Sequence, residues 1–272
     1  MSDQFQIFFH LGYSKVASTW FQRIVFPALK GVIFHKKHHF KHHKQLLNHN
    51  PAGTHLFSTE KDKRIIQAAE EIGKLYPDAG FIVFLRRQDD WLLSRYKYRI
   101  RKHGRESFGE FFDLENDQGL WKKETLYYRK VIEEFEKSSS RKPLFMTYDQ
   151  LRENPGIFIK QLTDYLQTSI NPNAMTRHPR NVSFSEKQLI ILRKWNRLFP
   201  YRNEISRVKM VNKMHQKFRD LLLHIVAALA SGMPKGLVKE KSLLSDEELK
   251  SLKKIREFYR EDWEFCEKYA AF

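Results

Sequence analysis

A short polar loop follows the first apolar segment of the chain and carries residue types that bind phosphate. Residues 5–13 read Phe-Gln-Ile-Phe-Phe-His-Leu-Gly-Tyr, Ser14 and Lys15 come next, and Ser18 and Thr19 stand where an amphipathic helix is expected to begin. Where a strand ends and a helix starts, backbone N–H groups are free to bind an anion, and the helix dipole favours negative charge. Lys15 adds a cation, and the two hydroxyl groups add hydrogen-bond donors. Because Lys15 precedes the small residues instead of following them, this is not the Gly-x4-Gly-Lys-Ser/Thr loop of nucleoside triphosphatases.

A second strand-to-helix junction offers another anion site. Residues 81–85 read Phe-Ile-Val-Phe-Leu, Arg86 comes next, and Ser94 lies about two turns into the following helix, facing back toward it. Asp89 or Asp90 is a suitable N-cap for that helix. An arginine and a serine hydroxyl that converge from strand and helix suit a second, separate phosphate. An ordinary junction with solvated arginines explains either segment alone equally well, whereas the two segments together favour two phosphates.

In their order and spacing, these segments resemble sulfotransferases that use 3′-phosphoadenosine 5′-phosphosulfate (PAPS). The family's first loop, Pro-Lys-x-Gly-Thr/Ser-Thr, is matched by Ser-Lys-Val-Ala-Ser-Thr over residues 14–19. The family's second motif, an Arg followed eight residues later by a Ser, is matched by Arg86 and Ser94. The chain departs from the family in two places, because Ser14 replaces the usual Pro and Ala17 replaces the usual Gly. A Gly at the second position would allow a positive φ or a close approach to phosphate.

Two later segments extend the resemblance. Residues 144–166 are similar to the family's strand-plus-helix segment of the form Tyr-Glu-Asp-Leu…Pro. Residues 180–183, Arg-Asn-Val-Ser, are similar to the Asn-x-Ser found downstream in many bacterial members. The resemblance covers roughly residues 5–198 and therefore implies a bacterial-type sulfotransferase with a P-loop-like fold.

The resemblance implies a donor site that spans both junctions. It assigns Lys15 to the departing 5′-phosphate, and Arg86 and Ser94 to the 3′-phosphate. The donor-binding residues of the first loop are then Lys15, Val16, Ala17, Ser18, Thr19 and Trp20. Trp20 matches the residue on which the family stacks adenine, and it fits a core aromatic residue equally well. PAPS is thus the expected co-substrate, adenosine 3′,5′-bisphosphate (PAP) the product, and no metal is expected.

The acceptor hydroxyl needs a general base, and two candidates flank the strand expected over residues 54–58. Glu60 lies just past the end of this strand, where the resemblance places the catalytic carboxylate of glycan-acting members. It fits equally well as an acid that complements a helix dipole in a first turn. His55 resembles the family's Lys-Thr-His base, but its position at the start of the strand points away from the site. His10, inside the first strand, fits a core histidine better than a base.

Five histidines cluster in a short basic segment. They are His35, His38, His39, His42 and His43, with Lys36, Lys37, Lys41 and Lys44 around them. If this segment were helical, the histidines would line one face. Histidines at positions i and i+4 can chelate a metal, but no Asp, Glu or Cys accompanies them. A basic face for an acidic acceptor is the better functional interpretation, and a solvated or pH-sensitive face is the simpler one.

The elements that position these residues alternate along the chain. Strands are expected over 5–9, 54–58, 81–85 and 144–147, and helices over 18–30, 60–75, 89–103 and 154–167, with a largely helical insertion over 107–137. This alternation predicts an α/β fold with a parallel sheet flanked by helices. Ligands in such folds collect at the carboxyl ends of the strands, where both phosphate motifs fall.

The last third of the sequence has a helical pattern. Helices are expected over 185–199, 213–230 and 245–269, and the last is preceded by a capping box from Ser245 to Glu248. We expect one sulfotransferase domain over 1–272. Within it, residues 1–170 would form the α/β donor-binding core, and residues 171–272 a mainly helical lid or acceptor-side region.

Composition narrows the class of protein. The chain has 272 residues, 41% of them apolar, and a formal net charge of +17, which favours acidic ligands or anionic surfaces. Its single cysteine, Cys266, excludes a disulfide framework and fits a reducing compartment. The sequence leaves no room for a signal peptide before the first strand, so we expect a cytoplasmic protein. The most apolar run, residues 221–230, is too short to span a bilayer. It is interpreted as a buried helix, a dimer face or a contact with a membrane surface.

These features predict a cytoplasmic, bacterial sulfotransferase that acts on a hydroxyl of a carbohydrate or glycolipid. The basic charge favours an acidic acceptor, and nucleic acid ranks lower because no nucleic-acid module is present. The alternative is a non-catalytic polyanion-binding protein on the same fold, with a donor loop weakened at Ser14 and Ala17. A nucleotide kinase ranks third because the triphosphatase loop is missing. The sequence leaves the oligomeric state open.

Overall fold

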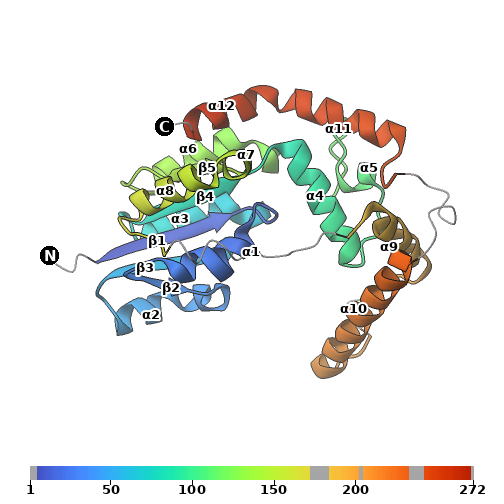
Figure 1. The fold of residues 1–272 in the computed structure, drawn as a ribbon, viewed down its shortest axis with the longest axis horizontal. Helices are drawn as coiled ribbons and strands as arrows, with labels where there is room; N and C mark the ends of the chain where they lie inside the picture. The colour runs from blue at the N-terminus through green and yellow to red at the C-terminus, as the bar shows by residue number, and fades with distance from the viewer. Residues whose placement is uncertain (1–4, 172–183, 202–204, 233–241, 271–272) are drawn as a thin grey trace. The chain divides into compact units, whose positions relative to one another are not determined.

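The computed structural model describes residues 5–171, 184–201, 205–232 and 242–270 (Figure 1). Contacts between residues divide the chain into two compact units. The first unit comprises Met1–Trp91, Glu124–Arg180 and Phe258–Phe272, and the second comprises Leu92–Lys123 and Asn181–Glu257. The predicted division into a core over 1–170 and a helical region over 171–272 stays a prediction. Residues 180–183, which resemble the family's Asn-x-Ser segment, lie outside the described residues.

The first unit is built on a five-stranded parallel sheet, which confirms the predicted α/β class. The strands are β1 (Gln6–Gly12), β2 (Val32–His35), β3 (Thr54–Glu60), β4 (Gly80–Leu85) and β5 (Leu144–Thr147). Their order across the sheet is β2-β3-β1-β4-β5, so the strand that precedes the polar loop is central. All six residues of β4 are buried, as expected of a strand covered on both faces.

Helices cover both faces of this sheet. The helices of the first unit are α1 (Ser18–Trp20), α2 (His43–His49), α3 (Ile65–Leu75), α6 (Tyr128–Ser138), α7 (Tyr148–Glu153), α8 (Pro155–Tyr165) and α12 (Arg260–Ala270). On one face, Phe84 of β4 packs against Phe21 and against Phe158 of α8, with ring centroids 4.4 and 5.3 Å away. On the other face, Phe81 packs against Phe135 of α6 at 5.1 Å. Side chains that alternate along β4 thus reach opposite layers.

The predicted helix over 18–30 is not a single α-helix. After the short α1, the chain forms a π-helical turn over Phe21–Val25 and a 3-10 turn over Phe26–Ala28. Pro27 has no backbone N–H to donate and thereby limits continuation of the helix. The change of helical type falls in the segment that follows the polar loop, and Phe21, Val25 and Phe26 of this segment are buried in the core.

The histidine segment also differs from a single helix. His35 ends β2, a 3-10 turn covers Lys37–His42, and α2 begins at His43. Val32, Ile33 and Phe34 are β-branched or aromatic residues, and their pairing with β3 makes them a strand. The five histidines therefore do not line one helix face.

Several element boundaries were predicted inexactly. Strand β3 extends to Glu60, so this residue ends the strand instead of following it. Helix α4 covers Gln88–Arg101 and places Asp89 and Asp90 in its first turn, so neither is the N-cap. The predicted helix over 245–269 is two helices, α11 (Asp246–Phe258) and α12. Its capping box is confirmed, because Ser245 N donates to Glu248 Oε2 at 2.9 Å and Glu248 N donates to Ser245 Oγ at 3.2 Å.

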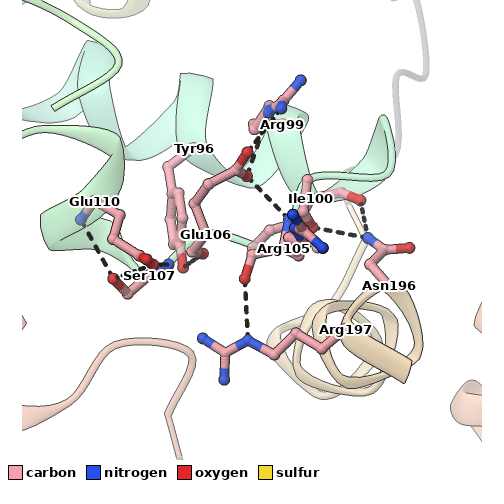
Figure 2. Close-up of polar contacts among 10 residues, drawn as sticks. Tyr96, Arg99, Ile100, Arg105, Glu106, Ser107, Glu110, Asn196 and Arg197 are labelled. Carbon is pink, nitrogen blue, oxygen red and sulfur yellow. Dashed lines mark hydrogen bonds and ion pairs between the residues drawn. The ribbon is translucent and has the colours of Figure 1, made fainter. Parts of the chain in front are cut away.

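The described part of the second unit is mainly helical. It contains residues 92–101 of α4, together with α5 (Phe108–Phe111), α9 (Glu186–Leu198), α10 (Lys209–Gly232) and most of α11. Figure 2 shows how the turn after α4 is fixed to α9. Buried Asn196 donates from Nδ2 to the carbonyls of Ile100 and Gly104, both at 2.9 Å, and Arg197 donates from Nε to the carbonyl of Arg105 at 3.0 Å. These bonds satisfy the carbonyl of Ile100 at the end of α4 and the carbonyls of Gly104 and Arg105 in the turn that follows.

Candidate active site

The carboxyl edge of the sheet brings the two predicted phosphate motifs together. The first loop leaves β1 at Gly12, and Arg86 follows the end of β4 on the neighbouring strand. Arg86 donates from Nη1 to the carbonyl of Lys15 at 3.3 Å, so the second junction holds the first loop directly. On the other side of β1, Glu60 is paired in register with Gly12, and the Lys61 N–H donates to the Gly12 carbonyl at 3.0 Å.

The loop itself is tightly turned. Lys15 and Ala17 both have left-handed backbone conformations, with φ of 69° and 65°. The Ala17 carbonyl accepts hydrogen bonds from the N–H groups of Trp20 and Phe21, at 2.8 and 3.2 Å, so Ala17 begins the helical turn. Left-handed residues in a turn orient neighbouring N–H groups toward a shared concavity that suits an anion. The Val16 side chain is buried beneath the loop.

The positive φ at Ala17 is the conformation that the family's Gly would allow. Replacing Ala17 by Gly is expected to raise the free energy of unfolding by about 0.5–1 kcal/mol. A left-handed conformation costs an L-residue about 1–2 kcal/mol, and the larger unfolded-state entropy of Gly cancels part of this gain. Urea denaturation measures the difference. The matched control, Ala228→Gly within α10, should instead lower stability by about 1 kcal/mol, and an equal loss in both variants would contradict the strain at Ala17.

Ser14 is fixed at every polar atom. Its N–H and its hydroxyl donate to the two carboxylate oxygens of Asp62, at 2.7 and 3.1 Å, and its carbonyl accepts from the indole N–H of Trp91 at 2.7 Å. Where the resemblance leads one to expect Pro, which has no N–H, this chain has an N–H that Asp62 satisfies. Asp62 and Trp91 are therefore positioning residues for the loop that the sequence did not identify. The sequence signal that could have identified Asp62 is its position, two residues after Glu60 and in the turn that follows the strand.

Replacing Asp62 by Ala is expected to lower the free energy of unfolding by about 2 kcal/mol. The change leaves the Ser14 N–H without its acceptor, and it also places Ala at a position with φ of 28°, which Asn tolerates better. Asp62→Asn should therefore lose clearly less stability than Asp62→Ala in urea denaturation. Wild-type stability in both variants would show that the Ser14 contacts contribute nothing.

The hydroxyl residues of the loop differ in their surroundings. Ser18 is buried, and its Oγ donates to the carbonyl of Tyr13 at 3.2 Å, which closes the loop on itself. Lys15 and Thr19 are half-buried. Trp20 is half-buried too, and its ring packs edge-on against Phe21 with centroids 4.9 Å apart. The Trp20 indole N–H is buried and has no partner among the described residues. Its predicted contact with adenine stays a prediction.

Arg86 has the surroundings of an anion-binding residue. Its guanidinium lies over the ring of Tyr148, 4.7 Å from the centroid, and its own carbonyl accepts from the Tyr128 hydroxyl at 3.0 Å. Its Nε is buried and has no hydrogen-bond partner in the described part of the chain. A buried cationic donor without a partner is costly unless a ligand satisfies it. Ser94 belongs to the second unit, so the pairing of Arg86 with Ser94 stays a prediction.

The neighbouring Arg87 is already paired. It donates to both carboxylate oxygens of Asp89, at 2.7 and 3.2 Å, and to Asp90 at 3.3 Å. The hydrogen bond to Asp89 raises the pKa of Arg87, against the lowering effect of burial. The two adjacent arginines therefore differ, because Arg86 has a buried donor without a partner among the described residues, whereas Arg87 is held by two carboxylates.

The two base candidates lie at opposite ends of β3. Glu60 is paired in register with Gly12 at the loop, whereas His55 is paired with Ile7, about 16 Å away along the strand. The Glu60 side chain is 22% exposed and forms an ion pair of 2.8 Å with Lys37, which is 55% exposed. Glu60 is thus beside the loop and within reach of solvent, as a proton acceptor for an incoming hydroxyl must be.

Both ring nitrogens of His55 have partners. Nε2 is 3.0 Å from the carbonyl of Ala52, which can only accept, so Nε2 carries the proton. Nδ1 is then the acceptor for His35 Nε2, 2.9 Å away. Burial, and secondarily the neighbouring His55, lowers the pKa of His35 to about 4, so the His35 ring is neutral near pH 7. His55 has no lone pair left for a substrate in this arrangement, which favours Glu60.

His10 lies inside β1, two residues before Gly12. It is fully buried, its Nδ1 is 2.7 Å from Ser58 Oγ, and that hydroxyl accepts from Gln22 Nε2 at 3.0 Å. Burial lowers the pKa of His10 to about 3, so the ring is neutral near pH 7. This matches the core histidine that the sequence suggested. Among the described residues, no group of three or more His, Cys, Asp or Glu side chains could hold a metal ion.

Comparisons with known proteins identify a family and a fold. A family model described as a sulfotransferase domain matches residues 8–262. Among solved structures, a sulfotransferase from Alicyclobacillus acidocaldarius superposes with a TM-score of 0.53 at 13% identity, covering 70% of this chain and 92% of that one. The mouse sulfotransferase SULT7A1, solved in complex with PAP, gives a TM-score of 0.42 at 16% identity, covering 68% of this chain and 67% of that one. No curated protein matches the sequence.

Proposed function

The chain belongs to the sulfotransferase family, and we propose that it moves the sulfuryl group of PAPS to a hydroxyl of a carbohydrate or glycolipid. The observation that carries the proposal is the contact between the two motifs. Arg86 Nη1 binds the Lys15 carbonyl at 3.3 Å, so a cationic loop and a separate cationic donor occupy one edge of the sheet. A donor with phosphate groups at both its 5′ and 3′ positions suits such a pair of sites.

The chain's residues can be given roles in the transfer. The acceptor oxygen bonds to sulfur while the bond between sulfur and the bridging phosphate oxygen breaks, and charge grows on the departing phosphate. Lys15 and the loop N–H groups stabilise that charge, an effect of about 3 kcal/mol for one well-placed donor. Glu60 accepts the proton of the acceptor hydroxyl. Arg86 holds the 3′-phosphate and orients the donor. The role of Ser94 at this phosphate stays a prediction from the resemblance.

The class of acceptor is inferred from the surroundings of the loop. A pocket of about 150 Å³ adjoins Tyr13, and its polar lining residues are Asp62, Lys63, Glu124, Thr125 and Lys130. Carboxylates and hydroxyl groups of this kind suit sugar hydroxyls, which both donate and accept hydrogen bonds. The lysines and the net charge of +17 favour an acceptor that carries negative charge. A cytoplasmic location and a bacterial origin remain predictions.

The proposal is tested by transfer of labelled sulfate from PAPS to a panel of acceptors. The panel contains neutral glycans, acidic glycans, glycolipids, and phenol and steroid alcohols as non-carbohydrate acceptors. We expect the fastest transfer to a carbohydrate hydroxyl, with acidic glycans ahead of neutral ones. Transfer confined to the phenols or steroids would overturn the proposed acceptor class.

The net charge of +17 also fits a second function, a non-catalytic polyanion-binding protein on the same fold. The same panel separates the two functions when binding is measured beside transfer. Tight binding of acidic glycans without transfer to any acceptor would favour the non-catalytic protein. Turnover that is lost in Lys15→Ala, with glycan binding retained, would favour the enzyme.

A further inference from the structure

Helix α10 of the second unit has two apolar faces. One face packs against α9 and includes Leu223, Ala227 and Ala230, which are all at most 3% exposed. The other face is open to solvent. We define the apolar stripe of α10 as Met210, Val211, Met214, Phe218, Leu221, Ile225 and Leu229, whose exposed fractions lie between 39% and 70%.

The stripe is continuous along the helix. With 3.6 residues per turn, its seven members fall within an arc of about 100° on the side opposite Leu223. The other residues of α10 within that arc are Ala228 and Gly232, so no polar side chain interrupts it. Single exposed apolar residues are ordinary, but a continuous row of large ones marks a surface that binds something.

The charges beside the stripe are positive. Lys209, Lys213 and Lys217 are exposed on the same helix. Asp220 is the helix's one acidic residue, and it is engaged elsewhere, 3.2 Å from His103 Nε2 and 3.6 Å from Lys102 Nζ. The stripe is therefore bordered by Lys213 and Lys217, while the one carboxylate of α10 is engaged by His103 and Lys102.

We propose that the apolar stripe of α10 docks on an anionic lipid surface. An amphipathic helix with large apolar residues on one face and lysines beside them lies in the plane of a bilayer interface. The apolar side chains enter the boundary of the acyl chains, and the lysines meet the lipid phosphates. None of the described helices is apolar enough along sufficient length to cross a bilayer, so the contact is peripheral.

The charges decide between lipid and a second copy of this chain. Two copies of α10 packed through their stripes would have no acidic residue free to pair with the flanking lysines. Helix pairs of that kind are usually stabilised by opposite charges beside the apolar seam. An anionic bilayer supplies the missing negative charge, and a neutral one does not.

The test uses the full chain and sedimentation with lipid vesicles. Vesicles of phosphatidylcholine with 40% phosphatidylglycerol are compared with pure phosphatidylcholine at 0.1 M and 0.5 M NaCl. We expect binding to the anionic vesicles at low salt, at least tenfold weaker binding at high salt, and little binding to the neutral vesicles. Absence of binding to the anionic vesicles would overturn the proposal.

Two pairs of variants locate the contact. Phe218→Gln with Leu221→Gln should weaken binding at least about a hundredfold, whereas Leu75→Gln with Leu249→Gln, at exposed leucines of α3 and α11, should not. Lys213→Gln with Lys217→Gln should weaken binding by about thirtyfold, whereas Lys250→Gln with Lys253→Gln on α11 should change it much less. Circular dichroism confirms that each variant is folded. If a double variant of α10 and its control double variant weakened vesicle binding equally, the assignment of the contact to α10 would be overturned.

Sedimentation velocity without lipid tests whether a second copy of the chain covers the stripe instead of a lipid surface. We expect a species of the monomer's mass for wild type and for Phe218→Gln with Leu221→Gln. A wild-type dimer that this double variant converts to monomer would overturn the proposal and assign the stripe to a second copy of the chain.

Discussion

Replacing Glu60 by Gln is expected to lower sulfate transfer by at least about a hundredfold while the affinity for PAP stays near wild type. Gln has the size and hydrogen-bonding groups of Glu but does not accept a proton, and general-base catalysis contributes about a hundredfold to ten-thousandfold. Glu60 ends β3 beside Gly12 and lies outside the loop that would hold the donor. The effect should therefore fall on turnover and not on donor binding. Turnover with saturating PAPS and PAP affinity by calorimetry measure the two quantities.

Two control variants and one histidine variant sharpen this prediction. Glu70→Gln, at an exposed position of α3, should leave both quantities unchanged. Lys37→Gln removes the 2.8 Å ion pair of Glu60 but keeps its carboxylate, so it should change turnover far less than Glu60→Gln. Normal turnover in Glu60→Gln would place the base elsewhere, and His55→Gln would then be the next variant to measure.

Replacing Arg86 by Ala is expected to weaken PAP by about a hundredfold and to weaken adenosine 5′-monophosphate by less than about threefold. The two nucleotides differ in the 3′-phosphate, and loss of a charge-assisted contact to it costs about 3 kcal/mol. The buried Nε of Arg86, without a partner among the described residues, is the free donor that this phosphate would meet. Calorimetric titration with both nucleotides measures the ratio.

Arg87→Ala is the control for this ratio. Arg87 is held by Asp89 and Asp90, so its loss should not change the preference for PAP over the monophosphate. Because Arg86 also donates to the Lys15 carbonyl, Arg86→Ala should slightly loosen the loop for both nucleotides. Equal weakening of the two nucleotides by Arg86→Ala would show that the second phosphate motif is misassigned.

The sheet and its functional edge could be predicted from the sequence because their signals are local. Residues 81–85 form a continuous apolar run, as a strand covered on both faces requires, and the polar residues that follow them mark the strand's end. The sequence pattern placed Lys15 and Arg86 after the carboxyl ends of two strands of a parallel sheet. Their contact then follows from the strand order, in which β1 and β4 are neighbours.

Contacts between two loops, or between side chains on paired strands, could not be predicted in the same way. The hydrogen bonds from Ser14 to Asp62 join two loops 48 residues apart, and no local pattern specifies that pairing. The partner of His55 was missed because the histidine spacing was weighed only for the case of a helical segment, whereas pairing with β3 makes the segment that ends at His35 a strand. Tertiary pairing overrode the helical spacing of the histidines.

Titration of the wild-type protein with PAP, followed by thermal unfolding, tests the donor site most directly. At about a hundred times its dissociation constant, PAP should add roughly 2.7 kcal/mol to the free energy of unfolding. For a protein of this size, that is a rise of several degrees in Tm. Lys15→Ala should show a much smaller rise at the same PAP concentration. A wild-type Tm that stays unchanged at millimolar PAP would contradict a donor site at the edge formed by Lys15 and Arg86.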